Sequence, residues 1–118
     1  MLEGVRVVEL ATWVAGPSAA AVMADWGATV IKVESGSGDA TRRAGVADAS
    51  ASPVFEFENR GKRGVVLDIG AEAGREALIR MLGDADIFIT NLRPRSLQRA
   101  RLDYDSLKDQ LPHLVYCS

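Results

Sequence analysis

The sequence has little of several residue types that mark common classes of protein. Among 118 residues there are 1 cysteine and 1 histidine. A single cysteine excludes an internal disulfide framework and any cysteine-rich metal site, and we expect no metal centre. No apolar run approaches the ~18–20 residues that span a bilayer. Because Glu3 and Glu9 interrupt the start of the chain, it does not resemble a signal peptide either. These absences predict a soluble, cytoplasmic protein that does not act at a membrane.

What is present favours one folded domain. Hydrophobic residues make up 47% of the chain, and 14 basic residues against 16 acidic ones leave a formal charge of -2. That balance favours a packed core over disorder. The length matches one domain of about 100–150 residues. The final apolar segment, however, has no turn or polar tail after it, which is typical of a strand whose sheet continues. We therefore expect a partial domain.

Short apolar runs alternate with helical patterns along the chain. The predicted strands are residues 5–10, 29–34, 64–69, 86–91 and 113–118. A helix is predicted from Pro17 to the residues before Gly27, and others are predicted over residues 72–82, 94–101 and 103–110. Residues 35–52 are predicted to be a loop, and residues 53–59 fit either a short helix or an extended segment. This alternation predicts an α/β fold with a Rossmann-like open, mostly parallel sheet and crossover helices.

The ends of the predicted strands are the first places to look for a ligand, since open parallel sheets bind ligands there. The turn before Pro17 leads into a helix N-terminus that suits an anion, although a plain tight turn is the alternative. No G-x-G-x-x-G fingerprint is present, which argues against an NAD site. Glu34 is therefore expected to be a solvated strand end. Cys117, in the last apolar strand, is expected to be a buried, inert thiol.

Two segments are locally basic. Residues 59–63 hold three cations, and residues 91–101 hold four arginines and no acid. Arginine matches phosphate oxygens, so a nucleotide phosphate is one interpretation, and a solvated basic face is the other. Nucleic acid is not expected to be a partner, because no aromatic side chains are interleaved with the cations. None of the acidic residues forms a recognisable catalytic pair.

Several segments in order resemble the class III CoA-transferases of the CaiB/BaiF type. The matching segments are L-E-G-V-R-V-V-E-L (2–10), A-G-P (15–17), A-D-W-G-A-T-V-I-K-V-E (24–34), G-D-A-T-R (38–42), N-R-G-K-R-G-V-V-L-D (59–68), A-D-I-F-I-T-N-L-R-P (85–94) and P-H-L-V-Y-C-S (112–118). The resemblance covers essentially the whole chain. It implies an enzyme that moves CoA from an acyl-CoA to a carboxylic acid acceptor through an aspartyl covalent intermediate. Coenzyme A and acyl-CoA would then be substrates, with no permanently bound cofactor.

The resemblance also implies which residues contact CoA. The family's contacts fall on Val14, Ala15, Leu67, Asp68, Ile69, Gly70, Asn91, Leu92, Arg93 and Arg99. Arg99 and Arg93 would meet phosphate charge, and the main chain around Val14 and Ala15 would meet the pantetheine or thioester end. Two positions depart from the pattern, because Ser35 and Gly70 stand where some members have basic residues.

The catalytic aspartate of the family is expected to lie beyond the segment that ends at Ser118, so we assign no catalytic residue within this chain. The chain would then be the N-terminal part of a CoA-transferase large (Rossmann-like) domain, without the catalytic segment and small domain, and inactive by itself. Full-length family members are interlocked homodimers. Two alternatives stay open: the 2-methylacyl-CoA racemase branch of the same family, and a non-catalytic CoA-binding module or subunit.

Overall fold

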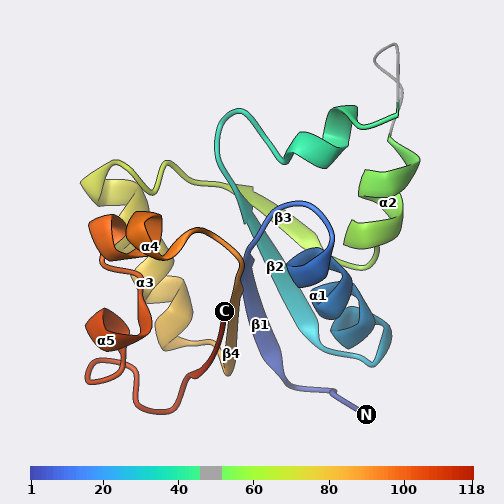
Figure 1. Ribbon diagram of the computed structural model, residues 1–118. Coiled ribbons are helices and arrows are strands. Elements are labelled where there is room, and N and C mark those ends of the chain that lie inside the picture. Colours follow the sequence, from blue (N-terminus) through green and yellow to red (C-terminus); the bar gives the residue numbers. More distant parts are fainter. Residues whose placement is uncertain (46–51) are drawn as a thin grey trace.

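The computed structural model describes residues 1–45 and 52–118. Its centre is a five-stranded sheet with the order β3-β2-β1-β4-β5 (Figure 1). All four strand pairs are parallel. The strands are β1 (Arg6–Leu10), β2 (Thr29–Glu34), β3 (Arg63–Val66), β4 (Ile87–Thr90) and β5 (Val115–Cys117). The predicted Rossmann-like α/β fold is confirmed, and its sheet is wholly parallel within the described residues.

Helices cover both faces of the sheet (Figure 1). One face carries α1 (Ala15–Asp25) and α2 (Pro53–Asn59), and the other carries α3 (Glu72–Gly83), α4 (Pro94–Ala100) and α5 (Tyr104–Leu107). Alternate residues of the strands supply the two cores. Val8 and Phe88 pack with the helices of the second face, whereas Val7 and Ile89 pack with α1. No helix among the described residues is long and apolar enough to cross a membrane.

Several element boundaries differ from the prediction. Helix α1 begins at Ala15 and not at Pro17. The first four N–H groups of a helix make no intrahelical hydrogen bond, so a proline in the first turn breaks none. β3 ends at Val66, so residues 67–70 lie outside the strand and lead through a turn into α3. Residues 53–59, which the pattern left undecided, form α2 with Pro53 at its start. The helix predicted over 103–110 is shortened to Tyr104–Leu107.

The predicted long loop contains a short 3-10 helix, η1 (Ala40–Arg43). It forms because the carboxylate of Asp39 accepts hydrogen bonds from the main chain and hydroxyl of Thr41. Residues 46–51 of the predicted loop lie outside the described residues. The prediction for Cys117 was wrong: its side chain is exposed, because β5 is the edge strand.

Candidate functional site

The strand order reverses between β1 and β4. β2 and β3 continue from one side of β1, and β4 and β5 continue from the other. In open α/β sheets this reversal leaves a crevice beyond the carboxyl ends of the two central strands, where ligands bind. The loops that follow β1 and β4 therefore form the candidate functional site.

A hollow of about 470 Å³, counted with its open mouth, lies at this end of the sheet. Its walls include three of the residues predicted to contact CoA, namely Leu67, Ile69 and Leu92. The ends of β1 and β2 complete it, with Leu10 and Val33 among the apolar residues and Glu34 and Asp39 among the polar ones. The lining is thus mostly apolar with a polar side, which is the usual composition of a small-molecule pocket.

The predicted contact Asn91 joins the two central loops. Its Oδ1 accepts a hydrogen bond from the Thr12 main-chain N at 2.9 Å, and its Nδ2 donates to the Thr12 carbonyl at 2.6 Å. Val14, another predicted contact, is the half-exposed N-cap of α1, and Ala15 is the first residue of that helix. The structure therefore brings Asn91 to the turn that leads to Val14 and Ala15.

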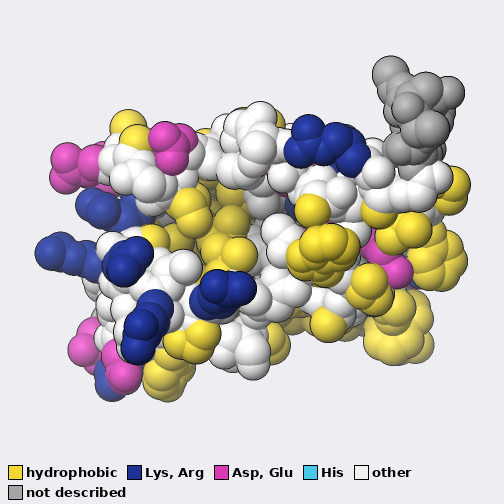
Figure 2. Space-filling view, turned by 45° about the horizontal axis from the view of Figure 1, so that its top comes forward, with side chains coloured by type: hydrophobic (Ala, Val, Ile, Leu, Met, Phe, Trp, Pro, Cys, Tyr) yellow, Lys and Arg dark blue, Asp and Glu magenta, His cyan; other side chains and the backbone are white. Residues whose placement is uncertain are grey.

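The predicted arginines lie beside the hollow, in a shallow basic depression. Arg93 and Arg99 line it together with Pro94, Arg95 and Ser96. Figure 2 looks onto this end of the molecule and shows Lys and Arg side chains grouped on the side of α3 to α5, with hydrophobic side chains in the hollow beside them. The remaining predicted contacts, Asp68 and Gly70, form a local turn in which the Gly70 N donates to the Asp68 carboxylate at 2.9 Å.

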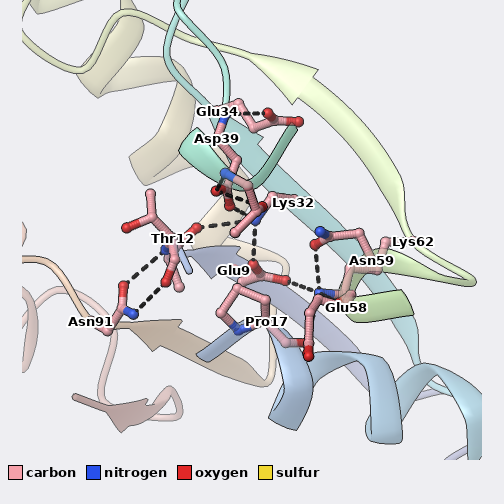
Figure 3. A network of polar contacts seen from close by, with 12 residues as sticks. Glu9, Thr12, Pro17, Lys32, Glu34, Asp39, Glu58, Asn59, Lys62 and Asn91 are labelled. Atoms are coloured by element: carbon pink, nitrogen blue, oxygen red, sulfur yellow. Dashed lines mark hydrogen bonds and ion pairs between the residues drawn. The ribbon is translucent and has the colours of Figure 1, made fainter. Parts of the chain in front are cut away.

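A buried ion network lies under the same loops (Figure 3). Glu9 of β1 is fully buried and accepts contacts from two lysines: Lys32 Nζ at 2.8 Å from one oxygen, and Lys62 Nζ at 2.6 Å from the other. Lys32 also reaches the Asp39 carboxylate at 2.9 Å and donates to the Ala11 carbonyl. Burial lowers the pKa of Lys62, and the Glu9 carboxylate opposes that shift.

The network continues to the end of β2. The guanidinium of Arg42 donates to both oxygens of Glu34, at 2.8 and 2.6 Å, and the Asp39 N–H donates to the same carboxylate. The Arg42 contact holds the pKa of Glu34 below its ordinary value. Burial opposes ionisation of Asp39, but the Thr41 N–H and the Lys32 ammonium outweigh it, so its pKa is also lowered. Glu34 is therefore buried and paired, and the prediction of a solvated strand end was wrong.

In the first basic segment, Lys62 belongs to this network rather than to an open surface. The side chain of Lys62 is 2% exposed and also donates to the carbonyls of Pro17 and Glu58, which ties α1 to the end of α2. Arg60 pairs with Asp25 of α1. Neither interpretation of residues 59–63, a phosphate site or a solvated face, describes Lys62. Arg63 of this segment is exposed and lines a separate open depression, whereas three arginines of residues 91–101 line the depression beside the hollow.

Sequence reasoning missed this network, although a signal for it exists. Glu9 and Lys32 each interrupt a run of β-branched residues that is typical of a buried strand. The register pairs these two residues on neighbouring strands. Opposite charges inside two adjacent buried strands indicate a buried ion pair, since a buried charge needs a partner.

Comparison with known proteins shows the family to which the chain belongs. The family model described as "CoA-transferase family III" matches residues 2–118. The chain belongs to this family. A crystal structure of a CaiB/BaiF family protein from Brucella suis superposes with a TM-score of 0.92 and 43% identity, and covers 99% of this chain and 32% of that one.

Curated relatives extend the match. The chain is 41% identical to the (R)-2-hydroxy-4-methylpentanoate CoA-transferase of Clostridioides difficile, over 98% of this chain and 30% of that protein. It is 39% identical to the cinnamoyl-CoA:phenyllactate CoA-transferase of Clostridium sporogenes, over 98% of this chain and 29% of that protein. The chain thus spans about a third or less of the length of these relatives. A short chain dehydrogenase/reductase family protein at 17% identity and a TM-score of 0.54 shares the fold alone.

Proposed function

We propose that this chain is the CoA-binding N-terminal part of an acyl-CoA:carboxylate CoA-transferase. The observation that supports it best is the pairing, at the reversal between β1 and β4, of an apolar hollow with a basic depression. CoA has both chemistries, since its adenine and pantetheine parts are largely uncharged and its phosphates are strongly negative. Arg93 and Arg99 would meet the phosphates. Leu67, Ile69 and Leu92 would line the site of an uncharged part, with Asp68 and Gly70 in the adjoining turn.

The reaction would follow the covalent route of the resembled family. An aspartate outside this chain would attack the thioester carbonyl. The C–S bond then breaks, the CoA thiolate departs, and an acyl-aspartyl anhydride stays on the enzyme. The name of the Clostridium sporogenes relative pairs an acyl-CoA with a carboxylic acid, and we propose the same substrate class here. The main chain at Val14 and Ala15 would lie at the thioester end. The segments that resemble the transferases favour this reaction over the racemase branch, whereas a non-catalytic CoA-binding subunit stays the alternative for the isolated chain.

Thermal unfolding with and without ligand tests the proposal. CoA that binds only the folded chain raises the melting temperature by mass action, and a CoA concentration of 100 times Kd adds about 2.7 kcal/mol of stability. We expect a rise with CoA, a smaller one with pantetheine, which lacks the nucleotide phosphates, and none with NAD. If millimolar CoA leaves the melting temperature of the folded chain unchanged, the proposal is overturned. An equal rise of the melting temperature with NAD would also overturn it.

An activity assay tests the division of labour. We expect the purified 118-residue chain to transfer no CoA from an acyl-CoA to a carboxylate. Transfer by the chain alone would contradict the placement of the catalytic aspartate outside it.

A further inference from the structure

The hydrogen bonds between Asn91 and Thr12 link the turn after β1 to the end of β4. The carboxamide of Asn91 has a carbonyl oxygen and an NH2 group, and each makes a hydrogen bond to the main chain of the same residue, Thr12 (Figure 3). The carboxamide thus binds the Thr12 N–H and C=O as the main chain of a neighbouring strand would. Alanine at position 91 would lose both bonds, and aspartate would keep only the acceptor.

The residue after Thr12 has an unusual backbone. Trp13 has a φ of 65°, in the left-handed region that a bulky side chain rarely adopts and that costs about 1–2 kcal/mol. Such a conformation persists only where the surrounding contacts impose it. On one side of Trp13 stand the bonds to Asn91. On the other, α1 begins so close to β1 that a Cβ on Gly16 would lie 2.6 Å from the Cβ of Ala11. The path of the turn is thus fixed at both ends.

From these contacts we propose that Asn91 is a positioning residue for ligand binding: it holds the turn of residues 12–15 in its strained, binding-ready shape. The inference rests on the proposed function, because that turn is where the thioester end of CoA would lie. It differs from the simple transfer of a family contact, since both hydrogen-bonding groups of the Asn91 carboxamide are directed to Thr12. Leu92 and Arg93 follow directly, so the same link joins the turn to the hollow and to the basic depression.

A purely structural role would have a different signature. If Asn91 only stabilised the fold, a variant that remains folded would keep the shape of the turn and the affinity for CoA. A positioning role predicts that the folded variant has a more mobile turn and a weaker affinity for ligand, because part of the binding energy is then needed to order the turn.

Tryptophan fluorescence provides the measurement. The chain has 2 tryptophans, and Trp26→Phe leaves Trp13 as the reporter of the turn. In that background Asn91→Ala is compared with Gln98→Ala, which removes an exposed carboxamide from α4. Below the melting temperature of each variant, we expect Asn91→Ala to increase the local motion of Trp13 in time-resolved anisotropy and to raise the Kd for CoA about tenfold. We expect Gln98→Ala to change neither.

Asn91→Asp is the second variant, and it carries the test if Asn91→Ala does not fold. At neutral pH the carboxylate of this variant and the Thr12 carbonyl oxygen repel each other. At low pH the protonated acid can donate a hydrogen bond to that oxygen. We expect its Kd for CoA, relative to the parent at each pH, to fall as the pH is lowered from 7 towards about 4, the ordinary pKa of an aspartate. Unchanged anisotropy and Kd in a folded Asn91 variant would overturn the inference. A parent chain that binds no CoA would instead overturn the proposed function, while the anisotropy still reports on the turn.

Discussion

The Lys62 ammonium and the Glu9 carboxylate meet at 2.6 Å in the interior, and both side chains are almost fully buried. Lys32 approaches the other oxygen of the same carboxylate. One negative charge on β1 is thus shared by cations from β2 and from the segment before β3. Since Lys62 also binds carbonyls of α1 and α2, this contact fixes both helices against the sheet.

Removal of the shared charge is expected to be severe. Glu9→Gln removes the carboxylate that Lys62 and Lys32 share, so Lys32 keeps Asp39 whereas Lys62 keeps only neutral acceptors. The loss of one partner from a buried ion pair typically costs about 3–5 kcal/mol. Urea unfolding followed by circular dichroism measures the effect. Glu76→Gln, the same change at an exposed position of α3, is the control and should stay within about 0.5 kcal/mol of the parent. A loss of stability in Glu9→Gln as small as that in the control would show that the network does not stabilise the fold.

Acid should weaken the loop after β2. The pKa values of Glu34 and Asp39 are both lower in the folded chain than their ordinary values. The unfolded chain therefore binds more protons at acid pH. The stability from these two carboxyls is fully present above about pH 4–5, and it disappears as the pH falls through their folded values.

Urea midpoints between pH 7 and pH 3 test this expectation. We expect a decrease below about pH 4, with a shallower decrease in Glu34→Gln, which has one fewer carboxyl to protonate. If the urea midpoint of Glu34→Gln decreased as steeply with acid as that of the parent, Glu34 would not be a source of the pH-dependent stability.

Two glycines of α3 are expected to respond in opposite directions to alanine. A Cβ on Gly74 would lie 2.0 Å from the Asp68 carbonyl oxygen, so the turn of residues 67–70 must move. Gly83, at the end of the same helix, has open space around it. Gly74→Ala should destabilise by about 1–3 kcal/mol, whereas Gly83→Ala should stabilise by up to about 1 kcal/mol. Thermal melts of the two variants measure both effects. A higher melting temperature in Gly74→Ala would show that residues 67–70 can move away from the added methyl group at little cost.

The sequence predicted the fold better than it predicted the site, and the reason is the range of the interactions. β2 was predicted with its correct ends, because a β-branched run stands next to Gly27. The shape of the hollow depends on contacts between segments far apart, such as Asn91 with Thr12 and Asp39 with Lys32. Local patterns do not contain that information, so Lys62 was assigned to an exposed basic segment although it is buried.

Arg99 should contribute to CoA affinity through phosphate charge. Arg99→Ala removes a guanidinium from the basic depression, and we expect the Kd for CoA to rise about tenfold, the equivalent of about 1.4 kcal/mol. The affinity for pantetheine should not change. Arg80→Ala, at an exposed arginine of α3, is the matched control. Calorimetric titration at two salt concentrations measures both effects. An equal loss of affinity for CoA and pantetheine would argue against a phosphate contact at Arg99.

The order of the sheet also determines when it can be completed during synthesis. β1 pairs on one side with β2, which follows it closely in the chain, but on the other side with β4, which comes only at Ile87–Thr90. The amides and carbonyls along one edge of β1 therefore stay unpaired until the segment from β2 to β4 has been made. Such unpaired edges promote misassociation. On a ribosome the β1-α1-β2 unit would be the first to form, and the candidate crevice between β1 and β4 could form only after β4 has been made.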